Sequence, residues 1–212
     1  MEHKYLDKVK SLEGPPKKVN IFSKKEIEMM IELYEILPER KYNKKQNVRK
    51  KGWQQNYNKE LDKIYFNKLT EALGDFKMDN LKSESGEDLY GLFHESFHPL
   101  PIHVDSGFNP EDIIYKQVIT PLAPIGDTIF FKKRWYGRST TFTVDPEELK
   151  FKPKADQNDR SNKHLGEKEF DKEIHKKYLS HLDINNLKGM EIEYIYEWKV
   201  GESLIIDRSH IH

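Results

Sequence analysis

The sequence predicts an α+β protein with a mainly β core, arranged as a barrel or sandwich with N-terminal helices packed on one outer face. Three observations support this. The first third of the chain has helical periodicity, and from about residue 89 short runs of β-branched and aromatic residues alternate with Pro, Gly and Asp. Its 212 residues suit one domain, and 11 Phe, 11 Tyr and 3 Trp supply bulky core material. We expect a single domain over residues 1–212, with a helical part at 1–82 and a β core at 83–212.

Two amphipathic helices are expected in the N-terminal part, after a Gly14-Pro15-Pro16 break. The first covers residues 23–37, where Ser23 and Glu26 form a capping box. Its apolar side chains recur at spacings of three and four: Ile27, Met30, Ile31, Tyr34 and Leu37. The second covers about 59–73 and ends at Gly74.

A basic stretch at residues 40–58 separates these helices. It has seven Lys or Arg and no acid, interleaved with Tyr42, Trp53 and Tyr57. Basic residues alternating with aromatic ones can bind nucleic acid. Because acids return at once in the next helix, a solvated connector is the favoured interpretation, and nucleic acid is not an expected partner.

The β core is expected to contain antiparallel strands at about 89–94, 113–120, 128–135 and 140–144. A polar insertion follows at about 150–180, with an exposed loop at 152–166 and a short helix at 167–179. Residues 190–198 and 203–206 flank a Gly201 turn and are expected to form a tight antiparallel pair.

Composition excludes several classes of function. With 36 basic and 36 acidic residues, the chain has no global field to hold nucleic acid or an anionic membrane. No run approaches the roughly 18 to 20 apolar residues that span a bilayer, and the N-terminus lacks a signal core, so a cytoplasmic protein is expected. The absence of cysteine excludes disulfides, thiolate zinc sites, iron–sulfur clusters and cysteine nucleophiles. Any metal must be bound by His, Asp or Glu.

One candidate metal motif is His94-Glu95-Ser96-Phe97-His98, which matches the H-E-x-x-H pattern of zinc peptidases. That motif works on a helix, whereas Pro99 directly after His98 disfavours one and the flanking residues alternate as in a strand. On a strand Glu95 would point away from His94 and His98. A zinc peptidase is therefore the less favoured alternative.

The other candidate motif is His103-Val104-Asp105, whose first and third residues point the same way on an extended segment. Alone it is also compatible with a surface His beside a turn Asp. The C-terminus strengthens it, because His210 and His212 follow the apolar run at 203–206. Two His and one carboxylate make a facial triad that leaves positions open on Fe(II) for oxygen and a chelating co-substrate.

With these motifs, residues 85–212 resemble the Fe(II)/2-oxoglutarate-dependent oxygenases, especially the hydroxylase-like branch with a cupin-like jelly-roll core, the double-stranded β-helix. The resemblance implies that His103, Asp105 and His212 bind Fe(II) and are catalytic, with 2-oxoglutarate and O2 as co-substrates. It implies hydroxylation of a small-molecule or peptide substrate. His212 fits the spacing better than His210, although the two share a strand face and could exchange. Asp207, Arg208 and Ser209 are expected to be structural.

The sequence departs from this family at the 2-oxoglutarate anchor. Many members carry a basic residue several positions after the distal His, whereas this sequence ends at His212. Either the sequence is truncated, or the anchor is on an inner strand, where Lys116 is the first choice and Arg134 and Arg138 are the reserves. A non-catalytic β-barrel that binds a ligand is the second class of function.

Overall fold

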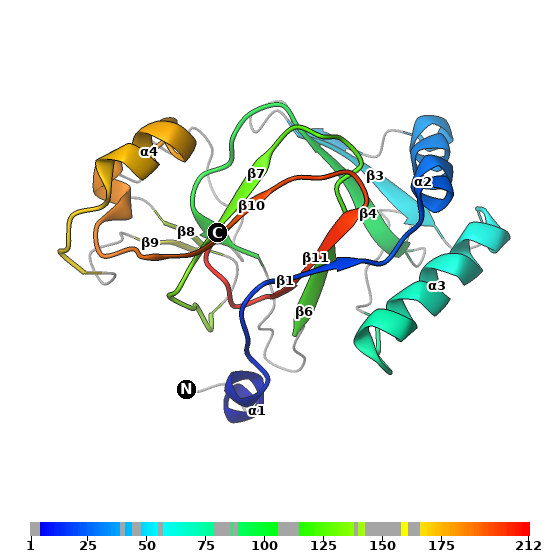
Figure 1. The fold of residues 1–212 in the computed structure, drawn as a ribbon, viewed down its shortest axis with the longest axis horizontal. Coiled ribbons are helices and arrows are strands. Elements are labelled where there is room, and N and C mark those ends of the chain that lie inside the picture. The colour runs from blue at the N-terminus through cyan, green and yellow to red at the C-terminus, as the bar shows by residue number, and fades with distance from the viewer. Residues whose placement is uncertain are drawn as a thin grey trace.

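The computed structural model describes residues 5–38, 41–43, 48–54, 57–78, 86, 89–105, 115–137, 140–142, 158–160 and 166–212. It is a mixed α+β structure with several antiparallel sheets and few helices, which confirms the expected α+β class with a substantial β core (Figure 1). Within this part of the chain, none of the helices combines the length and the apolar character needed to cross a membrane.

The elements follow one another from the N-terminus as a helix, a strand, a helix, a hairpin, a third helix and then mostly strands. The helices are α1 Leu6–Ser11, α2 Lys24–Ile36, α3 Lys59–Leu73, α4 Lys172–Tyr178 and the 3-10 helix η3 Ile184–Leu187. The strands are β1 Lys17–Asn20, β2 Lys41–Asn43, β3 Val48–Gln54, β4 Leu89–Ser96, β5 His103–Val104, β6 Lys116–Ile119, β7 Asp127–Phe131, β8 Thr140–Phe142, β9 Asn158–Arg160, β10 Ile192–Glu197 and β11 Glu202–Asp207.

Local sequence determines the two long helices as predicted. At the start of α2, the backbone N–H of Glu26 donates to Ser23 Oγ at 3.3 Å, and the N–H of Ser23 donates to Glu26 Oε2 at 2.6 Å. Helix α3 follows the N-cap residue Asn58 and ends at Gly74, which has a φ of 75°. The capping box that begins α2 and the glycine that ends α3 are therefore both confirmed, whereas the N-cap residue Asn58 was not identified from the sequence.

The basic stretch at residues 40–58 is not only a connector, and in this respect the expectation was wrong. It contains β2 and β3, and β3 pairs with β4 in an antiparallel sheet. Trp53 is 4% exposed, and its Nε1 donates to Asp62 Oδ1 at 2.9 Å. A tryptophan buried in this way cannot serve as a stacking platform for bases.

The strands around the C-terminus belong to two layers. One sheet has the order β1-β11-β6, with all pairs antiparallel. In the other layer β7 pairs with β10, and the last residues of the chain lie between β5 and β7. There the backbones of His103 and His212 exchange hydrogen bonds of 2.7 and 2.9 Å, and Phe131 N–H donates to Ile211 at 3.0 Å. The chain thus crosses repeatedly from one layer to the other.

Residues 190–198 and 203–206 do not form the tight pair that the sequence suggests. Strand β10 pairs with β7, whereas β11 pairs with β1 and β6, so the two strands lie in different layers. The turn at Gly201, with a φ of 79°, carries the chain from one layer to the other. An isolated two-stranded pair would leave both strands half exposed, whereas this arrangement buries β11 from Ser203 to Asp207.

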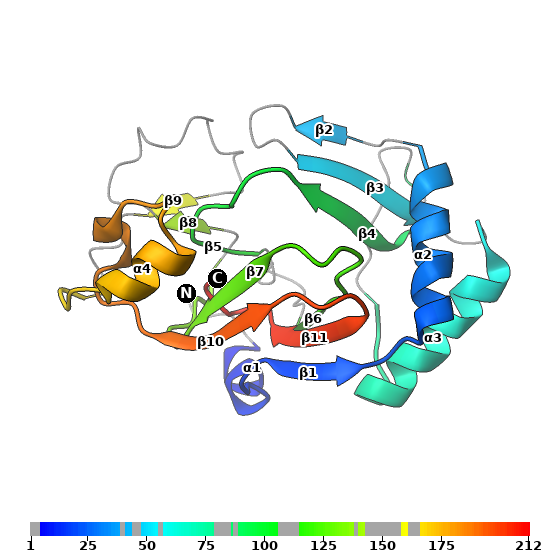
Figure 2. The same ribbon diagram turned by 45° about the horizontal axis from the view of Figure 1, so that its top comes forward.

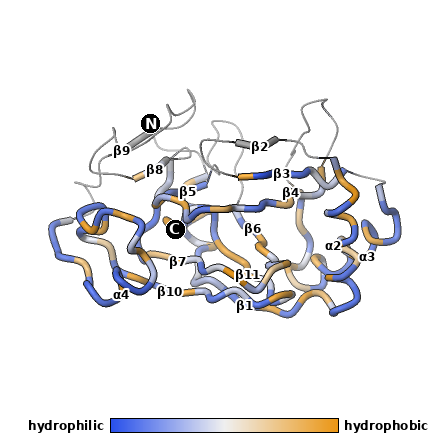
Figure 3. The backbone as a smooth tube through the Cα atoms, turned by 90° about the horizontal axis from the view of Figure 1, so that it is seen from above, coloured by the Kyte–Doolittle hydropathy of each residue, from blue (hydrophilic) through white to orange (hydrophobic). Residues whose placement is uncertain are grey.

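Figure 2 shows the strands between α4 at one end and α2 with α3 at the other, and Figure 3 colours the same backbone by hydropathy. Three of the apolar clusters in the described part of the chain hold the layers together. The first fills the space between the two layers and includes Phe130, Tyr196, Leu204 and Ile206. The second joins α2 and α3 to β3, β4 and the outer face of β6, and the third lies under α4 and η3. Figure 1 shows α2 and α3 at one end of the molecule and α4 at the other.

Of the polar insertion at about 150–180, the structure describes residues 158–160 and 166–180, and the other residues of the expected exposed loop at 152–166 lie outside the described residues. Strand β9 lies in it and runs parallel to β8, which the sequence did not predict. Helix α4 is shorter than the expected 167–179 and begins at Lys172, after the N-cap residue Asp171. The strand β1, in the N-terminal part, completes the sheet of β11 and so joins residues 1–82 to the core.

Candidate metal centre

The structure brings His103, Asp105 and His212 together. Each offers one ligand atom, and these atoms lie within 4.8 Å of one another. The Nε2 atom of His103 is 3.9 Å from Asp105 Oδ1, and Nε2 of His212 is 3.9 Å from Asp105 Oδ2. Among the described residues this is the one group of His, Asp and Glu with a geometry that could hold a metal ion.

Backbone pairing positions the ligands from two distant parts of the chain. His103 lies on β5, where it pairs with Thr141 of β8 on one side. On the other side its backbone N–H and C=O bond to His212. Because Ile211 is 1% exposed and bonded to β7, the last ligand lies in a packed layer and its ring contacts Phe130 at 5.7 Å between centroids.

The two imidazoles are held in the tautomer that a metal needs. Nδ1 of His103 is 2.8 Å from the carbonyl oxygen of Pro101, and Nδ1 of His212 is 3.0 Å from that of His210. A carbonyl oxygen only accepts hydrogen bonds, so each Nδ1 carries the proton and donates. In the neutral rings the lone pair is therefore on Nε2, which is the atom that faces Asp105.

The electrostatics of the site favour the protonation states in which His212 and Asp105 can bind a metal ion. Burial, and then the charge of His103, lower the pKa of His212 to about 4, so its ring is neutral at pH 7. Burial raises the pKa of Asp105, but His103, His212 and Arg208 and a hydrogen bond from Gln117 outweigh it and bring this pKa to about 2. An ionised carboxylate and a neutral imidazole are the forms that coordinate a cation.

A cation that the sequence assigned to a structural role lies beside the triad. Arg208 Nη1 is 3.8 Å from Asp105 Oδ2 and donates to Gln117 Oε1 at 2.6 Å. The side chain of Gln117 also contributes to the lowered pKa of Asp105. The position of Arg208 between β11 and the distal ligand indicates that it lies near the site. The conformation of the turn that points its side chain toward Asp105 cannot be predicted from the sequence.

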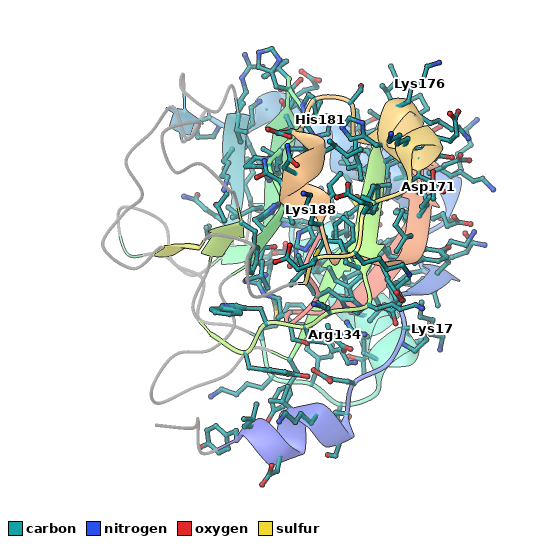
Figure 4. All side chains as sticks on the ribbon, turned by 90° about the vertical axis from the view of Figure 1, so that its left-hand side faces the viewer. Lys17, Arg134, Asp171, Lys176, His181 and Lys188 are labelled. Carbon is teal, nitrogen blue, oxygen red and sulfur yellow. The ribbon has the colours of Figure 1, made fainter. Side chains whose placement is uncertain are left out.

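Two of the three residues expected to anchor 2-oxoglutarate, Lys116 and Arg134, are not brought to the triad. Lys116 is ion-paired with Asp207 and donates to the backbone carbonyl of Leu12 at 3.1 Å. Arg134, labelled in Figure 4, is 3.2 Å from Glu193, and its side chain is 13% exposed. Arg138 lies outside the described residues. On β6 successive side chains alternate, so Gln117 and not Lys116 is on the face that reaches Asp105.

His210 is not exchangeable with His212. Its ring is fully buried, with Nε2 at 2.9 Å from Glu193 Oε2 and Nδ1 at 3.1 Å from the backbone oxygen of Asp207. Asp207 and Ser209 are structural, as expected. Asp207 accepts from the backbone N–H of Gly14 at 2.9 Å, and Ser209 Oγ donates to the Glu13 carboxylate at 2.8 Å.

The H-E-x-x-H motif does not form a helical zinc site. His94 and Glu95 lie on strand β4, and His98 follows the strand. Glu95 accepts a hydrogen bond from Tyr34 at 2.7 Å and another from Arg49 at 3.0 Å, which fixes its carboxylate. The expectation that this segment is a strand is confirmed.

Comparison with protein-family models, with curated proteins and with solved structures finds no match in any of the three. The interpretation of the site therefore depends on its geometry and chemistry.

Proposed function

We propose that the protein is a non-haem Fe(II)- and 2-oxoglutarate-dependent dioxygenase that hydroxylates a C–H bond of a small-molecule or peptide substrate. The observation that carries the proposal is the meeting of His103, Asp105 and His212, with both Nε2 atoms turned toward one carboxylate and free of backbone partners among the described residues. Two imidazoles and one carboxylate on one side of an ion leave the other positions for further ligands, as in the facial triads of iron oxygenases.

The layered strands support the same proposal. We interpret the sheet β1-β11-β6 and the layer formed by β5, the C-terminal segment, β7 and β10 as the two walls of a double-stranded β-helix. The apolar cluster around Phe130 and Leu204 would then be the interior of the barrel, with the triad at one end of it. Helices α2 and α3 pack on the outer face of one of these sheets. This agrees with the expected position of the N-terminal helices.

In this mechanism Fe(II) would be held by His103, Asp105 and His212. The bound ion, 2-oxoglutarate and O2 together supply the oxidation chemistry. The protein's residues bind and orient. The carbonyls of Pro101 and His210 hold both rings with Nε2 toward Asp105, and Arg208, hydrogen-bonded to Gln117, lies beside the Asp105 carboxylate. The phenyl ring of Phe130 against His212 limits the access of water on that side.

The proposal is tested by turnover of the co-substrate. The protein is loaded with Fe(II) and supplied with 2-oxoglutarate, ascorbate and O2, and release of succinate and CO2 is measured. We expect slow turnover even without the primary substrate, and none in a His103→Ala variant. A protein that holds Fe(II) but neither binds nor consumes 2-oxoglutarate would instead be a non-catalytic barrel.

A further inference from the structure

Among the described residues, a positively charged group beside the metal centre is the guanidinium of Arg208. It comes from the turn that follows β11, and its backbone N–H donates to the carbonyl of Tyr115 at 3.0 Å, which ties the turn to the start of β6. Its side chain is 18% exposed, and Nη1 lies 3.8 Å from Asp105 Oδ2. An arginine held this way carries a permanent positive charge at the edge of the coordination sphere.

Gln117 fixes the orientation of this guanidinium. Its amide oxygen accepts from Nη1 of Arg208 at 2.6 Å, and its side chain also lowers the pKa of the Asp105 carboxyl group. Arg208 and Gln117 therefore form a hydrogen-bonded pair beside the metal ligand Asp105.

The distances decide which part of a ligand this cation reaches. Metal–oxygen bonds to a carboxylate are about 2.0–2.2 Å, so Nη1 is within roughly 6 Å of any ion bound through Asp105 Oδ2. A carboxylate chelating the same ion lies within the reach of such a guanidinium. The far carboxylate of a five-carbon diacid lies at the other end of the molecule, away from the ion.

We propose that Arg208, oriented by Gln117, binds the chelating carboxylate of an α-keto acid co-substrate at the metal centre. This inference rests on the proposed function and deepens it. The guanidinium has five N–H donors, and a planar fork of such donors matches a carboxylate in bidentate geometry. Lys116 and Arg134 do not fulfil this role, because Asp207 and Glu193 hold them in a separate charge cluster.

The test compares two keto acids that share the chelating end. Pyruvate has the α-keto carboxylate of 2-oxoglutarate and lacks the far carboxylate. With Fe(II) saturating and oxygen excluded, binding of each is followed by the metal-to-ligand charge-transfer absorption. In Arg208→Gln the dissociation constants for both compounds should rise by the same factor, roughly ten- to a hundred-fold. Arg208→Lys keeps the charge but loses the fork, so its loss should be smaller for both.

A matched control is Arg49→Gln, which also removes an arginine paired with a carboxylate, Glu95, at 3.0 Å, but on β3. It should leave both dissociation constants unchanged. Thermal melting and Fe(II) binding are measured for every variant, so that a variant that fails to fold is recognised and Arg208→Lys then decides.

Each outcome is decisive. Weakened binding of 2-oxoglutarate with unchanged binding of pyruvate would mean that Arg208 anchors the far carboxylate, and would overturn the proposal. Unchanged binding of both would also overturn it while leaving the proposed function intact. A wild-type protein that holds Fe(II) and shows charge transfer with neither compound would overturn the proposed function, and this inference with it.

Discussion

Replacing Asp207 by Asn should destabilise the fold by removing the charge at the centre of a buried cluster. Asp207 is 4% exposed, is paired with Lys116, lies 3.8 Å from Arg134 and accepts from the Gly14 N–H at 2.9 Å. Removing one member of a buried ion pair costs about 3–5 kcal/mol. Here Lys116 is 39% exposed and Arg134 keeps Glu193, so solvent screening and the remaining partner reduce the loss to about 2 kcal/mol.

The assay is urea denaturation of the metal-free protein, followed by tryptophan fluorescence. The matched control is Glu191→Gln, which also removes a carboxylate that bridges two cations, Lys132 and Lys168, but does so on the surface. Its unfolding midpoint should equal that of the wild type. Equal unfolding midpoints for Asp207→Asn and Glu191→Gln would refute the claim that the buried charge cluster around Asp207 stabilises the fold more than the surface cluster around Glu191.

Three further predictions concern single side chains. His212 has a pKa of about 4 in the folded protein and about 6.5 in an unfolded chain, so the unfolded state takes up a proton first as pH falls. The free energy of unfolding of the metal-free protein should therefore fall by about 3 kcal/mol between pH 6.5 and 4, and this part of the slope should be missing in His212→Gln; equal slopes would contradict it. Glu95→Gln should leave the bound metal unchanged when measured by elemental analysis, and loss of the ion would favour the H-E-x-x-H site. Trp53→Phe removes the donor to Asp62 and should lower the free energy of unfolding by about 1–2 kcal/mol in the same urea assay; a variant as stable as the wild type would show that this bond contributes nothing.

Elements that depend on neighbouring residues could be predicted from the sequence. The capping box of Ser23 and Glu26 and the stop at Gly74 act within one or two helical turns, so α2 and α3 agree with the expectation. Pairing between strands depends on distant segments and was predicted less well. The residues near Gly201 do not indicate that β10 and β11 lie in different layers, because the strands with which β10 and β11 pair are distant in the sequence.

The candidate site shows the same difference between features set by neighbouring residues and features set by distant segments. His103 and Asp105 follow from their spacing on an extended segment, and His212 from its place after an apolar strand. Lys116 was the expected anchor, but Gln117 is on the face of β6 that reaches the triad, and a shift of one residue reverses that face. The turn that points Arg208 toward Asp105 is fixed by the hydrogen bond from its backbone N–H to Tyr115, a contact across the sheet. Because such a contact cannot be predicted from the sequence, Arg208 was assigned a structural role.

The most direct test of the account is equilibrium binding of Fe(II), measured under anaerobic conditions for the wild type and single variants. We predict one ion per chain, lost in His103→Ala, Asp105→Ala and His212→Ala and retained in His94→Ala and His98→Ala. An ion that survives His103→Ala and is lost in His94→Ala would contradict the assignment of the site.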